Sequence, residues 1–293
     1  MAKFPVYNIC NLNADNARGN DDILVENLAG YLNKHYKKLH FPHRHSFYHI
    51  VVFTKGRGSH TIDFKTFPVK AGQAYFMIPG QVHTWDFKAA TEGYIINFSE
   101  SYFKSFLLAP NYLDRFSFFN GSAEDGVLQL NAATLRQVAL VVEEMLQLPE
   151  TSIQRSDLIK VLVLKFLLTV EAAAGEKPKA TVPQQKTLMF KNFRNLIEKN
   201  YRDLKLPNEY AALMYITPHH LNALCQDLSG RSAGELIRDR VLLEAKRLLV
   251  NEEMTATQIA TELNFKDASY FNRFFKKATA ITPFEFRKQI NKH

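Results

Sequence analysis

The sequence predicts a protein of two domains: a β-rich domain that ends in two helices, and then a domain made only of helices. The first observation is length, because 293 residues exceed the usual size of a single domain. The second is a change of pattern, since residues 41–98 are rich in β-branched and aromatic residues punctuated by Gly and Pro, whereas helical spacing begins only later. The third is charge, which is concentrated near the C-terminus.

Charge bears on the partner of the C-terminal domain. Residues 1–174 hold 17 Lys and Arg against 16 Asp and Glu, whereas residues 185–293 hold 18 against 12. Most of the net charge of +8 therefore lies in the last third of the chain. A basic excess of this kind is expected of a surface that meets a polyanion, but a merely soluble basic surface would have it too.

Composition excludes several classes of protein. Hydrophobic residues make up 46% and charged residues 23% of the chain, which excludes a disordered or collagen-like protein. No apolar run reaches about 18 residues, and the N-terminus lacks the order of a signal peptide. We therefore expect a cytoplasmic protein with no membrane segment. Cys10 and Cys225 have no CxxC spacing, which argues against a disulfide framework and a cysteine metal cluster.

Two helices are predicted after the strands. In the first, apolar residues recur at spacings of three and four, and Pro149 ends the segment. These residues are Leu135, Val138, Val142, Met145 and Leu146. The second segment, residues 156–175, is apolar on most faces. So much apolar surface must pack on the β domain, on the neighbouring helix or on a second copy of the chain. We expect a mixture, with one helix at the seam of a homodimer.

The stretch after these helices predicts an interdomain linker. Residues 175–185 are small or charged, contain Pro and have no periodicity. We therefore assign residues 1–174 to the N-terminal domain and residues 186–293 to the C-terminal domain.

The C-terminal domain begins with a pattern for two short helices joined by a tight turn. Thr217 suits a helix N-cap and Pro218 suits the first helical position. Leu221 and Leu224 (with Leu228) mark one buried face, and Gly230 suits a left-handed C-terminal cap. Together these signals predict a helix-turn-helix unit.

The same pattern recurs about 40 residues later. Thr255 and Gln258 form a capping box, and Asp267 caps the next helix, which Phe271 and Phe275 anchor at i and i+4. Between the copies, residues 232–249 open with another capping box and are long enough for a rigid connecting helix. The sequence thus predicts two helix-turn-helix units joined by one long helix.

Residues 186–290 resemble the DNA-binding domain of the AraC/XylS family of bacterial transcription regulators. The matching pieces are EYAALMYITPHHLNALCQDLSGRS, RVLLEAKRLL and DASYFNRFFKKATAITPFEFRK, in the order and spacing of that family. The resemblance implies that the second helix of each unit, residues 218–228 and 268–277, enters the major groove of double-stranded DNA. The implied DNA-binding residues are His219, Asn222, Gln226, Ser269, Asn272, Arg273, Lys276 and Lys277.

The sequence departs from that family at several positions. Ala223 and Asp227 stand where the family often has basic residues, so the first reading helix is expected to hold phosphates weakly, and Cys225 stands where the family often has Phe. Ala280 replaces a common Gly after the second reading helix, which is expected to strain that cap by about 1 kcal/mol.

The histidines of the β domain resemble a second known pattern. His43, His45, His49 and Gly56 keep the spacing of the first motif of the cupins, a superfamily of double-stranded β-barrels, with His49 in place of the usual Glu. A second cupin-like motif follows, in which Gly72, Pro79 and His83 match, with His83 one residue early. The N-terminal domain is therefore expected to be a cupin-like barrel.

Three interpretations of these histidines remain open. They could converge inside the barrel as a site for Zn, Fe, Ni or Cu. They could line a metal-free pocket, as in the sensor domains of the regulator family, or they could merely form hydrogen bonds within the barrel mouth. We favour the pocket and predict no cofactor, with a divalent metal as the alternative. The candidate effector-binding residues are His43, His45, His49, Tyr75, His83 and Trp85.

The combined interpretation is a transcription regulator with a small-molecule sensor. Its expected partners are double-stranded DNA, a small-molecule effector and a second copy of the chain, with RNA polymerase as a further candidate. Two rival hypotheses are a metal-dependent cupin enzyme that carries a DNA-binding module, and a constitutive regulator whose barrel is only a dimerisation scaffold. The effector, the operator sequence and the direction of regulation are not specified by the sequence.

Overall fold

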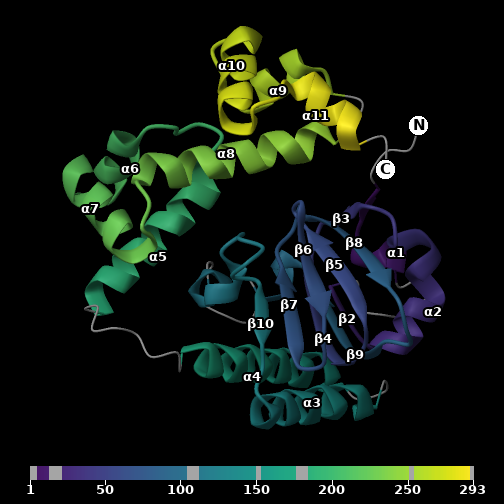
Figure 1. Cartoon of the computed structure of the whole chain (residues 1–293). Helices are drawn as coiled ribbons and strands as arrows, with labels where there is room; N and C mark the ends of the chain where they lie inside the picture. Colours follow the sequence, from purple (N-terminus) through teal and green to yellow (C-terminus); the bar gives the residue numbers. More distant parts are fainter. Residues whose placement is uncertain are drawn as a thin grey trace. The chain divides into compact units, whose positions relative to one another are not determined.

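The computed structural model describes residues 5–12, 22–103, 112–149, 153–175, 184–250 and 254–290. The chain divides into two compact units, Pro5–Pro178 and Lys179–His293 (Figure 1). Most of the predicted linker lies outside the described residues. No helix within the described residues has both the length and the apolar character needed to cross a membrane.

The N-terminal unit consists of two five-stranded sheets that face each other. Its strands are β1 (Val6–Tyr7), β2 (Ile23–Asn27), β3 (His43–His45), β4 (Tyr48–Lys55), β5 (Gly58–Ile62), β6 (Lys65–Val69), β7 (Gln73–Met77), β8 (Val82–Phe87), β9 (Glu92–Phe98) and β10 (Val127–Gln129). One sheet has the order β1-β3-β8-β5-β6, and the other has the order β10-β7-β4-β9-β2. This β-rich, two-sheet domain followed by helices confirms the predicted fold class.

Strand β4 explains how one sheet supports two cores. Ile50 and Val52 belong to the core that the sheet shares with helices α3 (Ala132–Gln147) and α4 (Arg155–Gly175). Val51 and Phe53 belong instead to the core between the two sheets. Because successive side chains point to opposite faces of a strand, the middle of β4, Ile50–Phe53, must be apolar on both faces.

Helices α3 and α4 pack against their own sheet (Figure 1). Val138, Val142 and Met145 of α3 are at most 1% exposed and lie in the core of their own domain. The apolar stripe of α3 is therefore covered by its own domain and is not free to form a dimer seam. If one of these two helices forms the seam of a homodimer, as the sequence predicts, it cannot do so through this stripe. Leu158, Val161 and Leu168 of α4 are between 43% and 49% exposed, so a different apolar face remains open to solvent.

A helix precedes most of the strands, contrary to the expectation that helical spacing begins only after residue 98. Helix α2 (Leu28–Leu39) follows the short helix α1 (Ile9–Leu12) and strand β2. It buries Leu28, Tyr31 and Leu39, while its other positions are largely polar. Three Lys residues and a Gly weaken the periodic apolar pattern, and tertiary packing of one narrow face stabilises the helix. Short 3₁₀ turns follow β9 at Glu100–Phe103, Tyr112–Arg115 and Ser117–Phe119.

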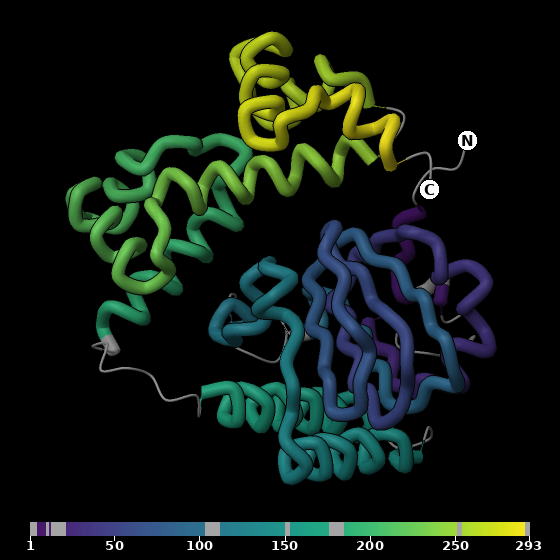
Figure 2. The backbone as a smooth tube through the Cα atoms, in the orientation of Figure 1, coloured from purple at the N-terminus to yellow at the C-terminus, as the bar shows by residue number. Residues whose placement is uncertain are grey.

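The C-terminal unit is made of seven helices within the described residues. They are α5 (Gln184–Asn200), α6 (Pro207–Leu213), α7 (Pro218–Ser229), α8 (Ala233–Leu249), α9 (Ala256–Glu262), α10 (Ala268–Thr279) and α11 (Pro283–Ile290). Helix α8 contacts α6 and α7 as well as α9, α10 and α11, and it runs between the two helix pairs (Figure 2). The predicted repeat of a helix pair on each side of a connecting helix is therefore present.

The two turns within the helix pairs have the same geometry. Tyr215 follows α6 with φ 56°, and Asn264 follows α9 with φ 51°, so both residues are left-handed. The next amide donates back into the preceding helix, from Ile216 to Ala211 at 3.0 Å and from Phe265 to Ala260 at 2.8 Å. This left-handed residue reverses the chain within the few residues that separate the paired helices.

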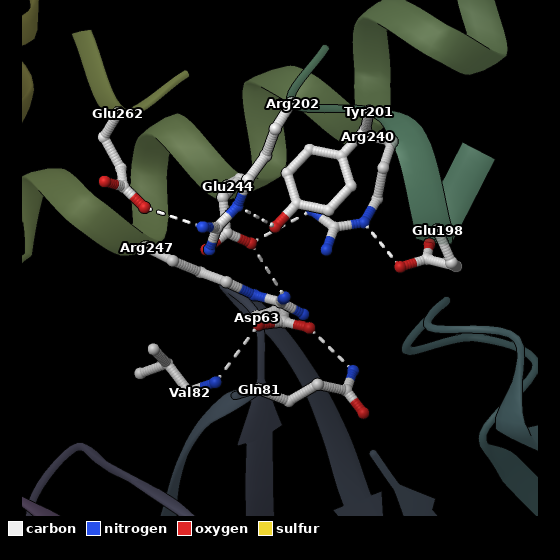
Figure 3. A network of polar contacts seen from close by, with 10 residues as sticks. All are labelled: Asp63, Gln81, Val82, Glu198, Tyr201, Arg202, Arg240, Glu244, Arg247 and Glu262. Carbon is white, nitrogen blue, oxygen red and sulfur yellow. Dashed lines mark hydrogen bonds and ion pairs between the residues drawn. The ribbon is translucent and has the colours of Figure 1, made fainter. Parts of the chain in front are cut away.

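A buried ionic network joins α5 and α8 (Figure 3). Arg240 donates to Glu198 of α5 at 2.7 Å and to Glu244 one helical turn away at 3.0 Å, and Arg247 donates to the same Glu244 at 3.3 Å. Arg240 also lies 3.7 Å from the centroid of the Tyr201 ring. The side chains of Arg240 and Glu244 are each 10% exposed, so these charges compensate one another away from water.

A second, exposed bond extends this network to α9. Arg202, which follows α5, donates to Glu262 at 2.7 Å (Figure 3). The polar contacts thus connect the helix before the first pair with the first helix of the second pair. Such contacts restrict how the two pairs can move relative to each other.

Candidate functional site

Helix α7 is positioned by the local signals that the sequence contains. The Thr217 side chain accepts from the backbone amide of His220 at 3.1 Å, Pro218 starts the helix, and Gly230 ends it at φ 66°. Leu221, Leu224 and Cys225 are buried against the rest of the domain. The opposite face is exposed and carries His219, Asn222 and Gln226.

Two of these three predicted DNA-binding residues already have partners within the domain. The Asn222 side-chain oxygen accepts from the backbone amide of Ala233 at 3.1 Å, at the start of α8. The Gln226 side-chain amide donates to the Gly230 carbonyl at 3.2 Å. On the same helix, Asp227 accepts from Lys186 of α5 at 2.7 Å, which neutralises an acidic group on this face. Asn222 therefore also anchors the connecting helix.

Helix α10 presents a more basic face. Asp267 caps it by accepting from the Tyr270 amide at 2.7 Å, and Phe271 and Phe275 are fully buried. The predicted DNA-binding residues of this helix are all exposed: Ser269, Asn272, Arg273, Lys276 and Lys277. Within the described residues, α10 thus offers three cations on its outer face, whereas the outer face of α7 offers neutral donors and His219.

The histidines of the N-terminal unit converge between the two sheets. His43 pairs with His83 in the register of β3 and β8, and their ring centroids are 4.1 Å apart. His45 lies 4.8 Å from both rings, and His49 of β4 lies 4.8 Å from His45. All four are at most 3% exposed. The structure therefore brings together the four histidines that the sequence singled out.

The two aromatic residues predicted with them lie in the same core. Trp85 is 2% exposed, and its ring is 5.6 Å from the His83 ring. Tyr75 is fully buried, and its hydroxyl donates to the Pro68 carbonyl at 3.0 Å. Tyr75 reaches the cluster through a further histidine, His60, whose ring is 4.8 Å away.

Burial keeps these imidazoles neutral. It lowers the pKa of His43 to about 4 and the pKa of His49 to about 3, because the charged form loses its hydration. Burial also lowers the pKa of His45, His60 and His83 well below the usual value, and repulsion between the neighbouring rings adds to it. Near neutral pH each ring therefore has one N–H and one lone pair.

Two segments of the chain match known domain families. Residues 27–162 match the AraC-like ligand binding domain, and residues 210–289 match a helix-turn-helix domain family. The chain belongs to the AraC family of transcriptional regulators.

Relatives of this AraC-family chain match it at low identity. The uncharacterized HTH-type transcriptional regulator YijO of Escherichia coli K12 is 30% identical over 103 residues, which are 35% of this chain and 36% of YijO. The match thus spans about a third of the length of that relative. The Msm operon regulatory protein of Streptococcus mutans is 24% identical over 250 residues, 83% of this chain and 84% of its own length.

Among solved structures, unsaturated fatty acid-bound ToxT from Vibrio cholerae matches 92% of this AraC-family chain and 96% of its own chain. Its identity is 12% and the TM-score is 0.41.

The histidine cluster includes two residues, His60 and Asn97, that were not predicted from the sequence. His60 of β5 lies with its Nε2 3.0 Å from the Nδ1 of His83, and Asn97 of β9 holds the Nδ1 of His49 through its side-chain oxygen at 2.6 Å. His60 alternates with the buried Ile62, which is a signal for an inward position in a strand. Asn97 had no such signal, because its contact depends on the pairing of β4 with β9.

The start of strand β8 is fixed by a separate buried contact. Asp63 accepts from the Gln81 side chain at 2.7 Å and from the Val82 amide at 3.2 Å (Figure 3). These bonds hold the β5–β6 turn against the start of β8, immediately before His83. They thereby help to fix His60 and His83 on neighbouring strands of one sheet.

Proposed function

We propose that this AraC-family chain is a sequence-specific DNA-binding regulator of transcription. The observation that carries the proposal is the repeat of a capped helix-turn-helix unit on each side of α8, with exposed polar donors on the second helix of each copy. Side-chain donors of this kind suit phosphates and base edges in the major groove. Each chain is expected to read a long, asymmetric site in two successive major grooves, about 34 Å apart.

The two reading helices are expected to contribute differently. Arg273 has the bidentate donor geometry that suits guanine, whereas Lys276 and Lys277 suit phosphates as point charges. Ser269 and Asn272 flank Arg273 on the exposed face of α10. Helix α7 offers His219, Asn222 and Gln226, so we expect it to supply base preference with little phosphate affinity.

The N-terminal unit is proposed to sense a small molecule. The match to an AraC-like ligand binding domain supports this assignment. An effector controls such a protein only if it binds two arrangements of the chain with different affinity, because equal affinity shifts no equilibrium. In this proposal the protein is a cytoplasmic regulator and not an enzyme, and RNA polymerase is a further partner.

A homodimer is part of the proposal, through α4 and not through the stripe of α3. Leu158, Val161 and Leu168 recur at spacings of three and seven, so they share one exposed face of α4. Burial of this face against a second copy would remove apolar surface from water.

Selection of binding sites from a random DNA duplex pool tests the proposed function. The expected result is one enriched asymmetric motif, with two preferred segments about one helical turn apart. The same selection at several salt concentrations separates base preference from phosphate attraction, which depends strongly on salt. Recovery of sequences with no common motif, by a folded protein, would contradict sequence-specific binding.

A further inference from the structure

The histidine cluster contains buried ring nitrogens that have no hydrogen-bond partner. These atoms are His43 Nε2, both ring nitrogens of His45, His49 Nε2, His60 Nδ1 and His83 Nε2. Buried polar atoms in folded proteins are almost always bonded, so several orphaned nitrogens in one place require an explanation. A water or an ion that binds between the rings would satisfy them.

The bonds that the rings do make determine which nitrogen is free to bind a ligand. His43 Nδ1 lies 2.7 Å from the Phe41 carbonyl, and His49 Nδ1 lies 2.6 Å from the side-chain oxygen of Asn97. Both oxygens can only accept, so each Nδ1 carries the hydrogen and each Nε2 keeps its lone pair. A neutral histidine held in this way, through the nitrogen that does not face the site, is the usual arrangement at a metal centre.

His83 can be held in the same way, with the ring of His60 in place of an oxygen acceptor. Its Nδ1 is 3.0 Å from the Nε2 of His60, and donation from His83 leaves the lone pair of His83 Nε2 unused. His45 has neither nitrogen engaged, so it can adopt the tautomer that a ligand requires. Free lone pairs are therefore available on all four rings.

The geometry brings nitrogens of three of these rings near a common point. One nitrogen from each of His43, His45 and His83 lies within 4.8 Å of the other two. Nitrogens bound to one Zn²⁺ at about 2.0–2.1 Å are separated by about 3.4 Å in a tetrahedron, so small ring rotations would complete the coordination. His49 lies 4.8 Å from His45 and 5.3 Å from His83 between ring centroids, which makes it the fourth candidate.

We propose that His43, His45 and His83, with His49 as the fourth ligand, bind one divalent transition-metal ion inside the barrel. Four neutral imidazoles suit Zn²⁺ and similar ions, whereas Mg²⁺ and Ca²⁺ prefer oxygen ligands. All four side chains are at most 3% exposed, which is typical of a closed, structural site without a coordinated water. The ion would join strands β3, β4 and β8, and Asn97 and His60 would act as positioning residues.

This inference goes beyond the proposed function, because metal binding by the barrel and DNA binding by the C-terminal unit are separate properties. The alternative is that the rings enclose only water. Both arrangements satisfy the orphaned nitrogens, but only a metal gives a defined stoichiometry and a ligand-field spectrum.

Metal loading of the full chain tests the proposal. The purified chain is stripped with a chelator, reloaded with Zn²⁺ or Co²⁺, passed through a desalting column and analysed for metal. The expected result is about one ion per chain, and the Co²⁺ form is expected to show the visible absorption of a tetrahedral nitrogen site. A folded chain that retains neither ion would overturn the proposal.

Matched variants locate the ion. His45→Gln and His83→Gln are expected to lose most of the bound metal and the Co²⁺ absorption, whereas His220→Gln removes an exposed histidine of α7 and is expected to retain both. Retention of one ion by a folded His43→Gln/His45→Gln/His83→Gln chain would place the metal elsewhere and overturn the site.

Two further measurements cover the case in which ligand variants do not fold. Thermal unfolding of the unmodified chain is expected to shift upward with added Zn²⁺, since an ion that binds only the folded state stabilises it. Asn97→Leu leaves every ligand in place but removes the acceptor for His49, and it is expected to weaken Co²⁺ binding and to alter its spectrum. An unmodified chain with no Zn²⁺-dependent shift and no spectrum contradicts the proposal, whatever the variants do. DNA binding by the same samples separates failure of this proposal from failure of the proposed function.

Discussion

Gly230 and Ala280 occupy the same left-handed position at the ends of the two reading helices. Gly230 follows α7 with φ 66°, and Ala280 follows α10 with φ 65°. Each amide donates back to the carbonyl four residues earlier, at 3.0 Å to Gln226 and at 2.8 Å to Lys276. The repeat therefore preserves the backbone geometry of the cap, although only one of the two residues is suited to it.

Exchange of these residues gives a reciprocal prediction. Ala280→Gly is expected to stabilise the C-terminal unit by about 0.5–1 kcal/mol, because Gly has no Cβ penalty at positive φ. Gly230→Ala is expected to destabilise it by about 1 kcal/mol, and the cause is conformational, since an added Cβ at Gly230 meets nothing within 4 Å. Calorimetry of the full chain measures both. Equal effects of the same sign would contradict this account of the caps.

Loss of the central carboxylate of the ionic network is expected to be costly. Glu244→Gln removes the carboxylate that Arg240 and Arg247 share, while Arg240 keeps Glu198, so the free energy of unfolding should fall by about 3 kcal/mol at neutral pH. Glu262→Gln is the matched control, because Glu262 is 41% exposed and its bond to Arg202 should contribute less than about 1 kcal/mol.

The stability that Glu244 contributes should decrease toward acid pH. Burial raises the pKa of Glu244, but the adjacent Arg247 and Arg240 guanidinium groups outweigh it, so the pKa is lowered overall. A carboxylate with a lowered pKa contributes its full stability above the unfolded pKa of about 4.3 and loses it as the pH falls through the folded pKa. The stability difference between the native chain and Glu244→Gln should therefore be constant above about pH 5 and shrink below it. A difference that grows toward acid pH would be inconsistent with this network.

DNA binding should separate the proposed roles of α10 residues. Arg273→Ala is expected to cost about 1–3 kcal/mol and to relax preference at one base pair, since it removes a bidentate contact. Lys276→Ala should weaken all sequences alike and reduce the slope of log affinity against log salt by about one unit. A base-substitution series and a salt series on the same duplex measure both effects. Unchanged base preference in Arg273→Ala would remove it from direct base reading.

Asn222 needs a control of its own, because its side chain also binds Ala233. Asn222→Asp keeps the acceptor for the Ala233 amide but replaces the side-chain donor. If Asn222 reads a base, Asn222→Asp should alter preference in the α7 half-site without loss of stability. If it only anchors α8, Asn222→Ala should lower stability and leave base preference unchanged.

The oligomeric state should depend on the exposed face of α4. Val161→Asp with Leu168→Asp places charges on this face, so the dimer is expected to dissociate to monomers in light scattering at micromolar concentration. Gln137→Asp on the exposed side of α3 is the control and should leave the dimer intact. A native chain that is already monomeric would contradict the proposed homodimer.

Signals that act over a few residues were predicted directly from the sequence. Thr217, Asp267 and Gly230 have the cap roles that their types and positions indicated. A cap forms between residues that are at most four positions apart, so no tertiary information is needed to find it. The spacing of His43, His45 and His49 likewise predicted that they could converge inside the barrel, because side-chain direction alternates along a strand.

The long-range contacts required the tertiary structure. The periodicity of α3 identified Val142 as apolar but not the surface that covers it, which is the sheet of its own domain and not a second chain. Asn222 has the residue type of a base-reading side chain, yet the fold brings it to the start of α8. The meeting of His49 with Asn97 and of His83 with His60 depends on strand pairing across 48 and 23 positions. Sequence periodicity determines which face of an element is buried, whereas the partner of that face is decided by sheet order and helix packing, which local propensity does not encode.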